Sequence, residues 1–177
     1  MTEILAVDLA TWCGWCRGKV GQPPTFGSVR FGGHHDRPAA VYATALDWFT
    51  ELLQHPPDVL MLEAVLPPSA WRGQSQASTF ARLGGLQSIA LGLAHKHGVG
   101  EITEVSVASI RAHFIGDRGM KRATAKKAVI ARCKRLGWEV KNDNEGDACA
   151  LWSYGCALID PKLALQVVPL FNWKLAG

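Results

Sequence analysis

The sequence predicts an α/β domain of three layers, with a mixed central β-sheet flanked by α-helices. Two observations support this prediction. Apolar runs of strand length alternate along the chain with longer segments whose apolar residues recur at helical spacing. The chain has 177 residues, of which 48% are hydrophobic and 19% are charged, so it has enough apolar material for one full core and too little charge for disorder.

The first half of the chain predicts four strands and one helix. ILAVDLA at residues 4–10 is a short apolar run, TWCGWC predicts a tight turn into a second strand, and TFGSVRF at 25–31 predicts a third. Residues 38–54 carry apolar side chains at helical spacing and predict an amphipathic helix, which ends at HPPD because proline cannot continue a helix. DVLMLEAV at 58–65 is apolar on both faces and predicts a buried strand.

The second half predicts helices that are separated by loops and one strand. We expect a single domain over residues 1–177, in which residues from about 160 onward form a peripheral extension. The predicted elements are a polar loop at 66–78, a helix at 78–98, a strand at 102–107, a short helix and glycine-containing loop at 107–124, a helix at 124–137 closed by Gly137, and a last helix through about Ile159.

The five cysteines include one closely spaced pair, Cys13 and Cys16 in CGWC. This spacing is typical of a redox pair or of half a zinc site. Because no second pair follows at zinc-finger spacing, ordinary thiols in a turn and in the core are the favoured interpretation.

Three carboxylates are each predicted at the end of a structural element. Asp8 ends the first strand and Glu63 ends the fourth, while Asp147 opens the last helix, with Asn144 and Asp143 three and four residues before it. If the first and fourth strands are neighbours, Asp8 and Glu63 lie close together, and such carboxylates are costly to bury without a cation. Mg²⁺ or Mn²⁺, which prefer oxygen ligands, are the predicted partners, and two ions suit phosphodiester cleavage.

A simpler interpretation exists for each acid. The stretch NDNEGDACALW also fits a helix N-terminus, where acidic residues complement the helix dipole and Asp143 or Asn144 caps free amides. Asp8 alone also fits a turn at a strand end.

Basic residues are concentrated between Arg111 and Arg135, where nine Lys or Arg stand against one acid, Asp117. Such a local excess favours a polyanionic partner, most often nucleic acid, although a solvated basic helix face explains it equally well. No apolar run approaches the roughly 20 residues of a membrane span, and the N-terminus lacks the basic region of a signal peptide. We therefore expect a soluble, intracellular protein without a membrane partner.

Four segments together resemble the RuvC-type Holliday junction resolvases of the ribonuclease-H-like superfamily, especially the small phage-borne versions. The resemblance covers most of residues 4–158. ILAVDLATWCGW resembles the family's first strand, and LMLEAVLPPSAWRGQSQASTFARLGGLQSIALGLA resembles the strand with the catalytic Glu and the helix after it, with Leu83-Gly84 at the Leu-Gly turn. VSVASIRAHFIGDRGMKRATAKKAV resembles the glycine loop that leads into a Lys-bearing helix, and DNEGDACAL resembles the closing acidic motif.

The resemblance implies a ribonuclease-H-like fold and a site built from Asp8, Glu63 and Asp147 around Mg²⁺, for which Mn²⁺ substitutes. The family usually has Asp or His at the position of Asn144, so either the amide of Asn144 is a weaker ligand or Asp143 or Glu145 replaces it. The family often carries an aromatic wedge at the position of Leu66, and Trp71 in the same loop is a substitute for it. The candidate DNA contacts are Arg118, Lys121, Arg122, Lys126, Lys127, Trp71 and Arg72.

The implied function is that of a homodimeric endonuclease that resolves four-way (Holliday) DNA junctions by paired, symmetric cuts in the cytoplasm of a bacterium or phage-infected cell. The helix segment LGGLQSIALGLA could supply the dimer interface or could instead pack on its own sheet. A nuclease for flaps or forks, and a catalytically weak junction-binding protein, remain alternatives. An actin-like or sugar-kinase ATPase is disfavoured, because 177 residues leave no room for its second domain.

Overall fold

The described strands form the middle layer, a five-stranded sheet in the order β3-β2-β1-β4-β5. The structure is a computed structural model that describes residues 1–33, 35–64 and 74–162. Strands β1, β4 and β5 run parallel to one another, whereas β2 and β3 are antiparallel to their neighbours, so the sheet is mixed as predicted. The strands are β1 (Glu3–Asp8), β2 (Trp12–Lys19), β3 (Thr25–Arg30), β4 (Val59–Glu63) and β5 (Glu101–Val105).

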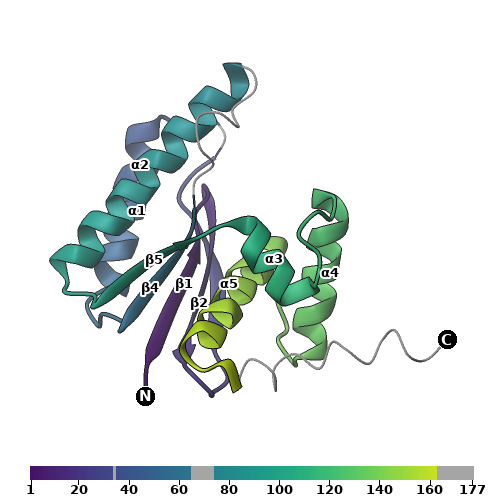
Figure 1. The fold of residues 1–177 in the computed structure, drawn as a ribbon. Coiled ribbons are helices and arrows are strands. Elements are labelled where there is room, and N and C mark those ends of the chain that lie inside the picture. The colour runs from purple at the N-terminus through teal and green to yellow at the C-terminus, as the bar shows by residue number, and fades with distance from the viewer. Residues whose placement is uncertain (34, 65–73, 163–177) are drawn as a thin grey trace.

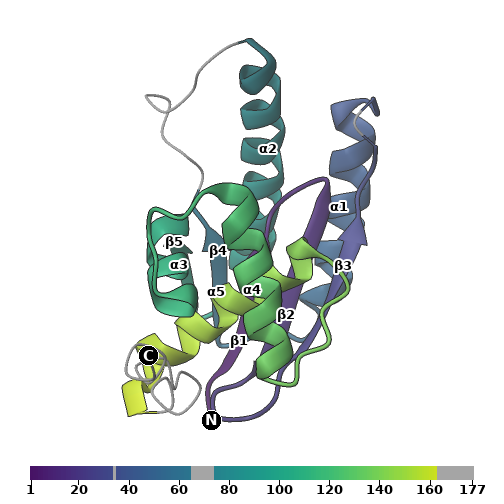
Figure 2. The same cartoon turned by 90° about the vertical axis from the view of Figure 1, so that its right-hand side faces the viewer.

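Helices cover both faces of this sheet, which gives the predicted three layers (Figure 1). Helices α1 and α2 lie side by side on one face. Helix α5 crosses the other face, and α3 and α4 pack against it (Figure 2). The helices are α1 (Pro38–Leu52), α2 (Gln74–Lys96), α3 (Val107–Ile115), α4 (Arg122–Arg135) and α5 (Asp143–Ile159).

The central strands β1 and β4 are apolar on both faces because each face lies against a separate core. Side chains alternate between the two faces of a strand. Leu5 and Leu60 accordingly lie in the core beneath α1 and α2, whereas Ile4 and Met61 lie in the core beneath α5. Continuing the alternation, Asp8 and Glu63 end their strands on the α5 side of the sheet.

The prediction of a tight turn at TWCGWC is wrong for all but Thr11, because residues 12–16 lie inside β2. Gly14 pairs with Asp8 on one side and with Ser28 on the other, and the turn occupies the residues between β1 and β2. The glycine does not form a turn but allows the backbone of α5 to approach β2 closely. A Cβ atom at this position would collide with the backbone oxygen of Asn144, so only glycine lets the start of α5 lie on the strand. Helix α2 also begins earlier than predicted, at Gln74.

The CGWC pair forms neither a redox couple nor half a zinc site. Residues three apart on a strand point to opposite faces. Cys13 is buried in the core beneath α1 and α2, whereas Cys16 is buried in the core beneath α5. All five cysteines are free and buried, and burial raises the pKa of the Cys13 and Cys16 thiols. They are core residues in their protonated form.

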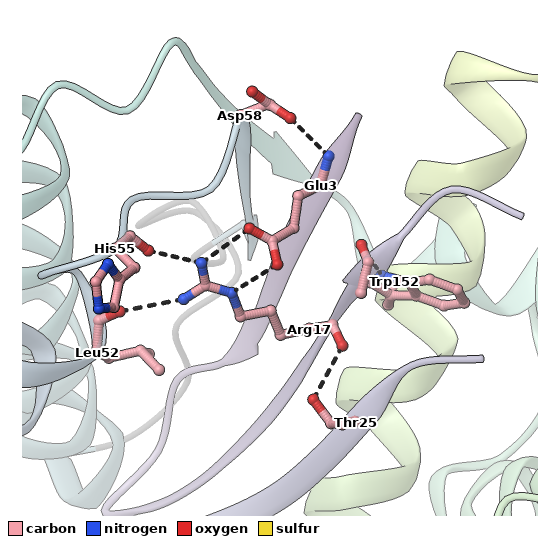
Figure 3. A network of polar contacts seen from close by, with 8 residues as sticks. Glu3, Arg17, Thr25, Leu52, His55, Asp58 and Trp152 are labelled. Carbon is pink, nitrogen blue, oxygen red and sulfur yellow. Dashed lines mark hydrogen bonds and ion pairs between the residues drawn. The ribbon is translucent and has the colours of Figure 1, made fainter. Parts of the chain in front are cut away.

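A polar network stabilises the end of the sheet opposite to the end that carries Asp8 and Glu63 (Figure 3). The Arg17 guanidinium forms a two-point ion pair with Glu3, with its shorter contact at 2.9 Å. It also donates to the backbone oxygens of Leu52, at 3.2 Å, and His55, at 2.6 Å. The network thus joins β1 and β2 to the connection between α1 and β4.

Replacement of Arg17 by methionine will lower the free energy of unfolding by about 1–2 kcal/mol, because the carbonyls of Leu52 and His55 lose their donors. Urea unfolding followed by circular dichroism measures this loss. The exposed Lys134→Met serves as the control and leaves the midpoint unchanged. Equal midpoints for both variants would show that the network adds nothing to stability.

Candidate active site

Two carboxylates lie next to each other at the carboxyl edge of the sheet. Strands β1 and β4 are parallel neighbours in a register that pairs Val7 with Leu62, so the next residues, Asp8 and Glu63, stand side by side. The neighbour relation on which the sequence prediction depended is therefore confirmed. Both residues are half-buried and face the layer that contains α5.

Helix α5 brings further carboxylates to this edge. It begins at Asp143, and its cap is Asn142, whose side-chain oxygen accepts the Glu145 N–H at 3.0 Å. Neither Asp143 nor Asn144 is the cap, because the helix already includes both. Asp143 and Asp147 are four residues apart and share one side of the helix.

Burial and mutual repulsion raise the pKa of the three carboxyls that meet here. Burial is the main cause for Asp8, whose pKa is also raised by the charges of Glu63 and Asp147. Burial and the charge of Asp147 raise the pKa of Glu63 to about 7. The pKa of Asp147 is raised mainly by burial. These effects place Asp8, Glu63 and Asp147 in one electrostatic cluster, hereafter the carboxylate cluster.

Three basic side chains surround the carboxylate cluster. Lys126 of α4 forms an ion pair with Asp143 and thereby lowers the pKa of that carboxyl, and its charge also acts on Asp8 and Asp147. Arg111 of α3 and Arg122 of α4 stabilise the ionised forms of Glu63 and Asp147. Lys126, which the sequence suggested as a DNA contact, is thus the ion-pair partner of Asp143.

Glu145 is turned away from the carboxylate cluster. Its buried carboxylate accepts hydrogen bonds from the Ser28 hydroxyl at 3.0 Å and from the Lys141 N–H at 2.8 Å. The Asn142 amide also donates to it, at 3.4 Å. Because these contacts occupy Glu145 on the β3 side of α5, the suggestion that it replaces the missing acid at Asn144 is wrong. Asp143 remains as the candidate.

The other predicted DNA contacts within the described residues are exposed and lie in or just before α4. Arg118 and Lys121 belong to the loop before α4, and Arg122 and Lys127 lie in its first turns. All four are exposed. Leu66, Trp71 and Arg72 lie outside the described residues.

Sequence reasoning missed two residues of this site. Arg111 was counted among the basic residues but was not assigned to the carboxylates, since only the packing of α3 on α5 brings it there. Gly14 was assigned to a turn. A glycine inside a strand often marks a place where another backbone approaches closely, and this feature of the sequence could have identified Gly14.

The donor set suits a hard divalent cation. Carboxylate oxygens are the ligands that Mg²⁺ and Mn²⁺ prefer, and Mg²⁺ takes only one or two from protein in many phosphate-handling sites. Over the described ranges, no three Asp, Glu, His or Cys side chains are arranged closely enough to hold a metal ion among themselves. The described helices also include none that is long and apolar enough to cross a membrane.

The raised pKa of Glu63 predicts a pH-dependent stability for the metal-free protein. Its ordinary value is 4.5 and its value in the fold is about 7, so the folded state binds an extra proton between these limits. Stability is therefore greatest at the acidic end of this window and declines as pH rises through 7, by about 2–3 kcal/mol. Glu63→Gln will make this decline smaller, and the raised pKa values of Asp8 and Asp147 account for the part that remains.

Thermal unfolding in EDTA at a series of pH values measures the effect. Glu51→Gln, which changes an exposed carboxylate on α1, is the matched control and retains the decline. If Glu63→Gln and wild type decline in parallel, Glu63 does not hold its proton in the fold.

Comparison with solved structures shows which fold contains this site. RuvC from Thermus thermophilus matches 89% of this chain and 95% of its own, at 13% sequence identity and a TM-score of 0.64. RuvC from T. thermophilus in complex with a Holliday junction substrate matches 90% of this chain and 96% of its own, at 12% sequence identity and a TM-score of 0.68. The yeast mitochondrial Holliday junction resolvase Ydc2 matches 93% of this chain and 84% of its own, at 14% sequence identity and a TM-score of 0.56.

No family model and no curated protein matches the sequence. The structural likeness nevertheless extends over nearly the whole chain, and the fold is the ribonuclease-H-like fold of RuvC.

Proposed function

We propose that this protein is a divalent-metal-dependent endonuclease that resolves four-way DNA junctions by paired, symmetric phosphodiester cleavage. The observation that carries the proposal is the carboxylate cluster, which stands where parallel strands β1 and β4 end and α5 begins. The fold adds support, because one RuvC structure with this fold contains a Holliday junction substrate.

Asp8, Glu63 and Asp147 would hold the cations, which we propose to be two Mg²⁺ ions or, in substitution, Mn²⁺. The amide of Asn144 or the carboxylate of Asp143 would complete the set. Bound metal supplies an activated water and charge stabilisation at the leaving oxygen. Because the charge of Asp147 raises the pKa of Asp8 and of Glu63 in the metal-free protein, a cation would relieve repulsion as well as bind.

The remaining charged residues act on the DNA and on the acids. Lys126 is paired with Asp143, so it holds that carboxylate beside the cluster and keeps it ionised. Arg111, near Glu63 and Asp147, offers a positive charge to the phosphate that is cut. The exposed residues that we propose as contacts to flanking phosphates are Arg118, Lys121, Arg122 and Lys127. Trp71 and Arg72 are further proposed contacts.

A homodimer would present two equivalent sites to the two symmetric strands of a junction. Helix α2 uses part of its glycine-rich segment within the chain, because Gly85 lies against the ring of Tyr42 on α1. Gly84 and Gly92 face open space and leave room for a second copy. A structure-selective nuclease for flaps or forks would use the same acids, so substrate choice must be measured.

Of the two residues that could complete the metal site, Asp143 is the one that has a carboxylate. Asp143→Ala will lower the cleavage rate by about 10-fold or more, because Lys126 loses its partner and the cluster loses a carboxylate. Single-turnover cleavage with Mg²⁺ measures the rate. Asp47→Ala, which alters an exposed acid on α1, is the control. An unchanged rate for Asp143→Ala would leave Asn144 as the only remaining candidate.

The function is tested with four end-labelled substrates, a mobile four-way junction, a flap, a linear duplex and a single strand, in Mg²⁺, Mn²⁺ or EDTA. We expect cuts in the junction alone, only with metal, at symmetric positions. Cuts spread over flaps and duplexes would replace the proposal with a broader nuclease. Tight binding without any cutting would mean a junction-binding protein.

A further inference from the structure

A pocket of about 460 Å³ opens beside the start of α5, between β2, β3 and the loop that precedes the helix. The strands contribute Trp12 and Phe26, and the loop contributes Glu139 and Lys141. Its volume lies within the roughly 300–1,000 Å³ of pockets that hold small ligands. The proposed cleavage reaction uses none of these residues.

Strand alternation shows which side chains point toward α5. Gly14 lies directly beneath the backbone of Asn144, and Trp12 is two residues away on the same strand, so both face this layer. Phe26 packs against the core beneath α5, and Ser28, two residues further, hydrogen-bonds Glu145 of that helix. Trp12, Phe26 and Ser28 therefore share the face of the sheet that carries α5, whereas Trp15, which also lines the pocket, belongs to the opposite face by the same alternation.

The pocket and the carboxylate cluster lie on two sides of the same helical turn. Asp147 belongs to the carboxylate cluster, and Asp143 lies on the same side of α5. Glu145 is two residues from each of them and thus points roughly 200° around the helix, where it lines the pocket. Ser28, Lys141 and Asn142 hold Glu145 in place, so the wall is rigid. Because a helix is about 10 Å across, we expect a DNA strand bound at the cluster to place a neighbouring nucleotide close to the pocket.

The chemistry of the lining suits a nucleobase. Trp12 is 48% exposed and is the one aromatic among the exposed large hydrophobic side chains of the described residues. Exposed aromatic faces stack unpaired bases, whatever their sequence. Lys141 and Glu139 are exposed at the rim and offer a donor and an acceptor to the edge of a base.

We propose that this pocket receives one unstacked nucleobase of the strand being cut, stacked on Trp12 and hydrogen-bonded by Glu139 or Lys141. The inference rests on the proposed function for its DNA substrate. Base pairs at the crossover of a junction are easier to open than those of a continuous duplex, so extrusion costs little there. A base in the pocket would fix which phosphate reaches the carboxylate cluster and would favour some bases at the cut.

The test places the fluorescent base 2-aminopurine at each position around the crossover in turn, with EDTA present so that no strand is cut. Wild-type protein is expected to change the emission at one position next to the cut and not at the others. Trp12→Ala will lose this response and bind the junction about 10-fold more weakly, whereas Trp12→Phe will retain the response. Leu158→Ala, an equally exposed apolar residue at the far end of α5, will behave as wild type.

A single-stranded trinucleotide with central 2-aminopurine separates the pocket from the proposed function. If the protein ignores junctions yet changes the emission of this probe through Trp12, the pocket stands and the proposed function fails. If the protein binds and cuts junctions but no 2-aminopurine position responds, or Trp12→Ala responds as wild type does, the pocket proposal is overturned.

Discussion

Asp147→Asn will reduce cleavage of a four-way junction by about 1,000-fold or more, because the carboxylate proposed as a metal ligand contributes several kcal/mol of charge stabilisation through the cation. Asp147 is half-buried in the second turn of α5, and its charge acts on both Asp8 and Glu63. The substitution keeps the shape of the side chain and removes its charge. Single-turnover cleavage with labelled junction measures the loss.

Binding separates a chemical role of Asp147 from a structural one. Junction affinity, measured in Ca²⁺ by gel shift, is expected to stay at the wild-type level or to rise slightly, since a negative charge near the phosphates is removed. Asp160→Asn, at the other end of α5, is the control and retains both cleavage and binding. Cleavage by Asp147→Asn at the wild-type rate would remove Asp147 from the mechanism.

Gly14→Ala will destabilise the protein by about 2–3 kcal/mol and abolish cleavage, although glycine 14 bears no functional group. Its new Cβ would collide with the backbone oxygen of Asn144, so either β2 or the first turn of α5 must move. That turn carries Asp143 and precedes Asp147, so the carboxylate cluster loses its geometry. The expected drop in melting temperature is roughly 5–10 °C, measurable by calorimetry.

Gly92→Ala is the matched control for this substitution. Gly92 is exposed within α2, and a Cβ there meets nothing within 4 Å. Since alanine favours helix over glycine, Gly92→Ala is expected to stabilise the protein by about 0.5–1 kcal/mol, and the comparison uses melting alone because Gly92 lies on the proposed dimer surface. If Gly14→Ala melts and cleaves like wild type, α5 does not depend on close contact with β2.

The layers and the placement of Asp8 and Glu63 at strand ends were predictable because periodicity and strand ends are local properties of the sequence. The apolar runs that contain Ile4 and Met61 predict buried strands, and a carboxylate at the end of each predicts a shared edge. That edge exists only because β1 and β4 pair in parallel, which the sequence left as a condition.

The directions of side chains around α5 were not predictable. Asp143 and Glu145 are two residues apart in one acidic stretch, yet one pairs with Lys126 and the other accepts hydrogen bonds from Ser28. The position of α5 on β2 and β3 determines which of these two side chains faces Lys126 and which faces Ser28. Gly14 is a second example. The sequence predicted that it lies in a turn, whereas in the structure it lies in β2, directly beneath the start of α5.

Paired cleavage of a plasmid-borne cruciform is the most direct test of the central claim, that the carboxylate cluster of a symmetric dimer cuts both strands of a junction. A cruciform in supercoiled DNA yields linear plasmid when both cuts occur in one binding event and nicked circles when they do not. With Mg²⁺, wild-type protein is expected to yield linear plasmid, and the Asp8→Asn variant is expected to leave it supercoiled. Nicked circles as the only product, or linear plasmid from Asp8→Asn, would contradict the account.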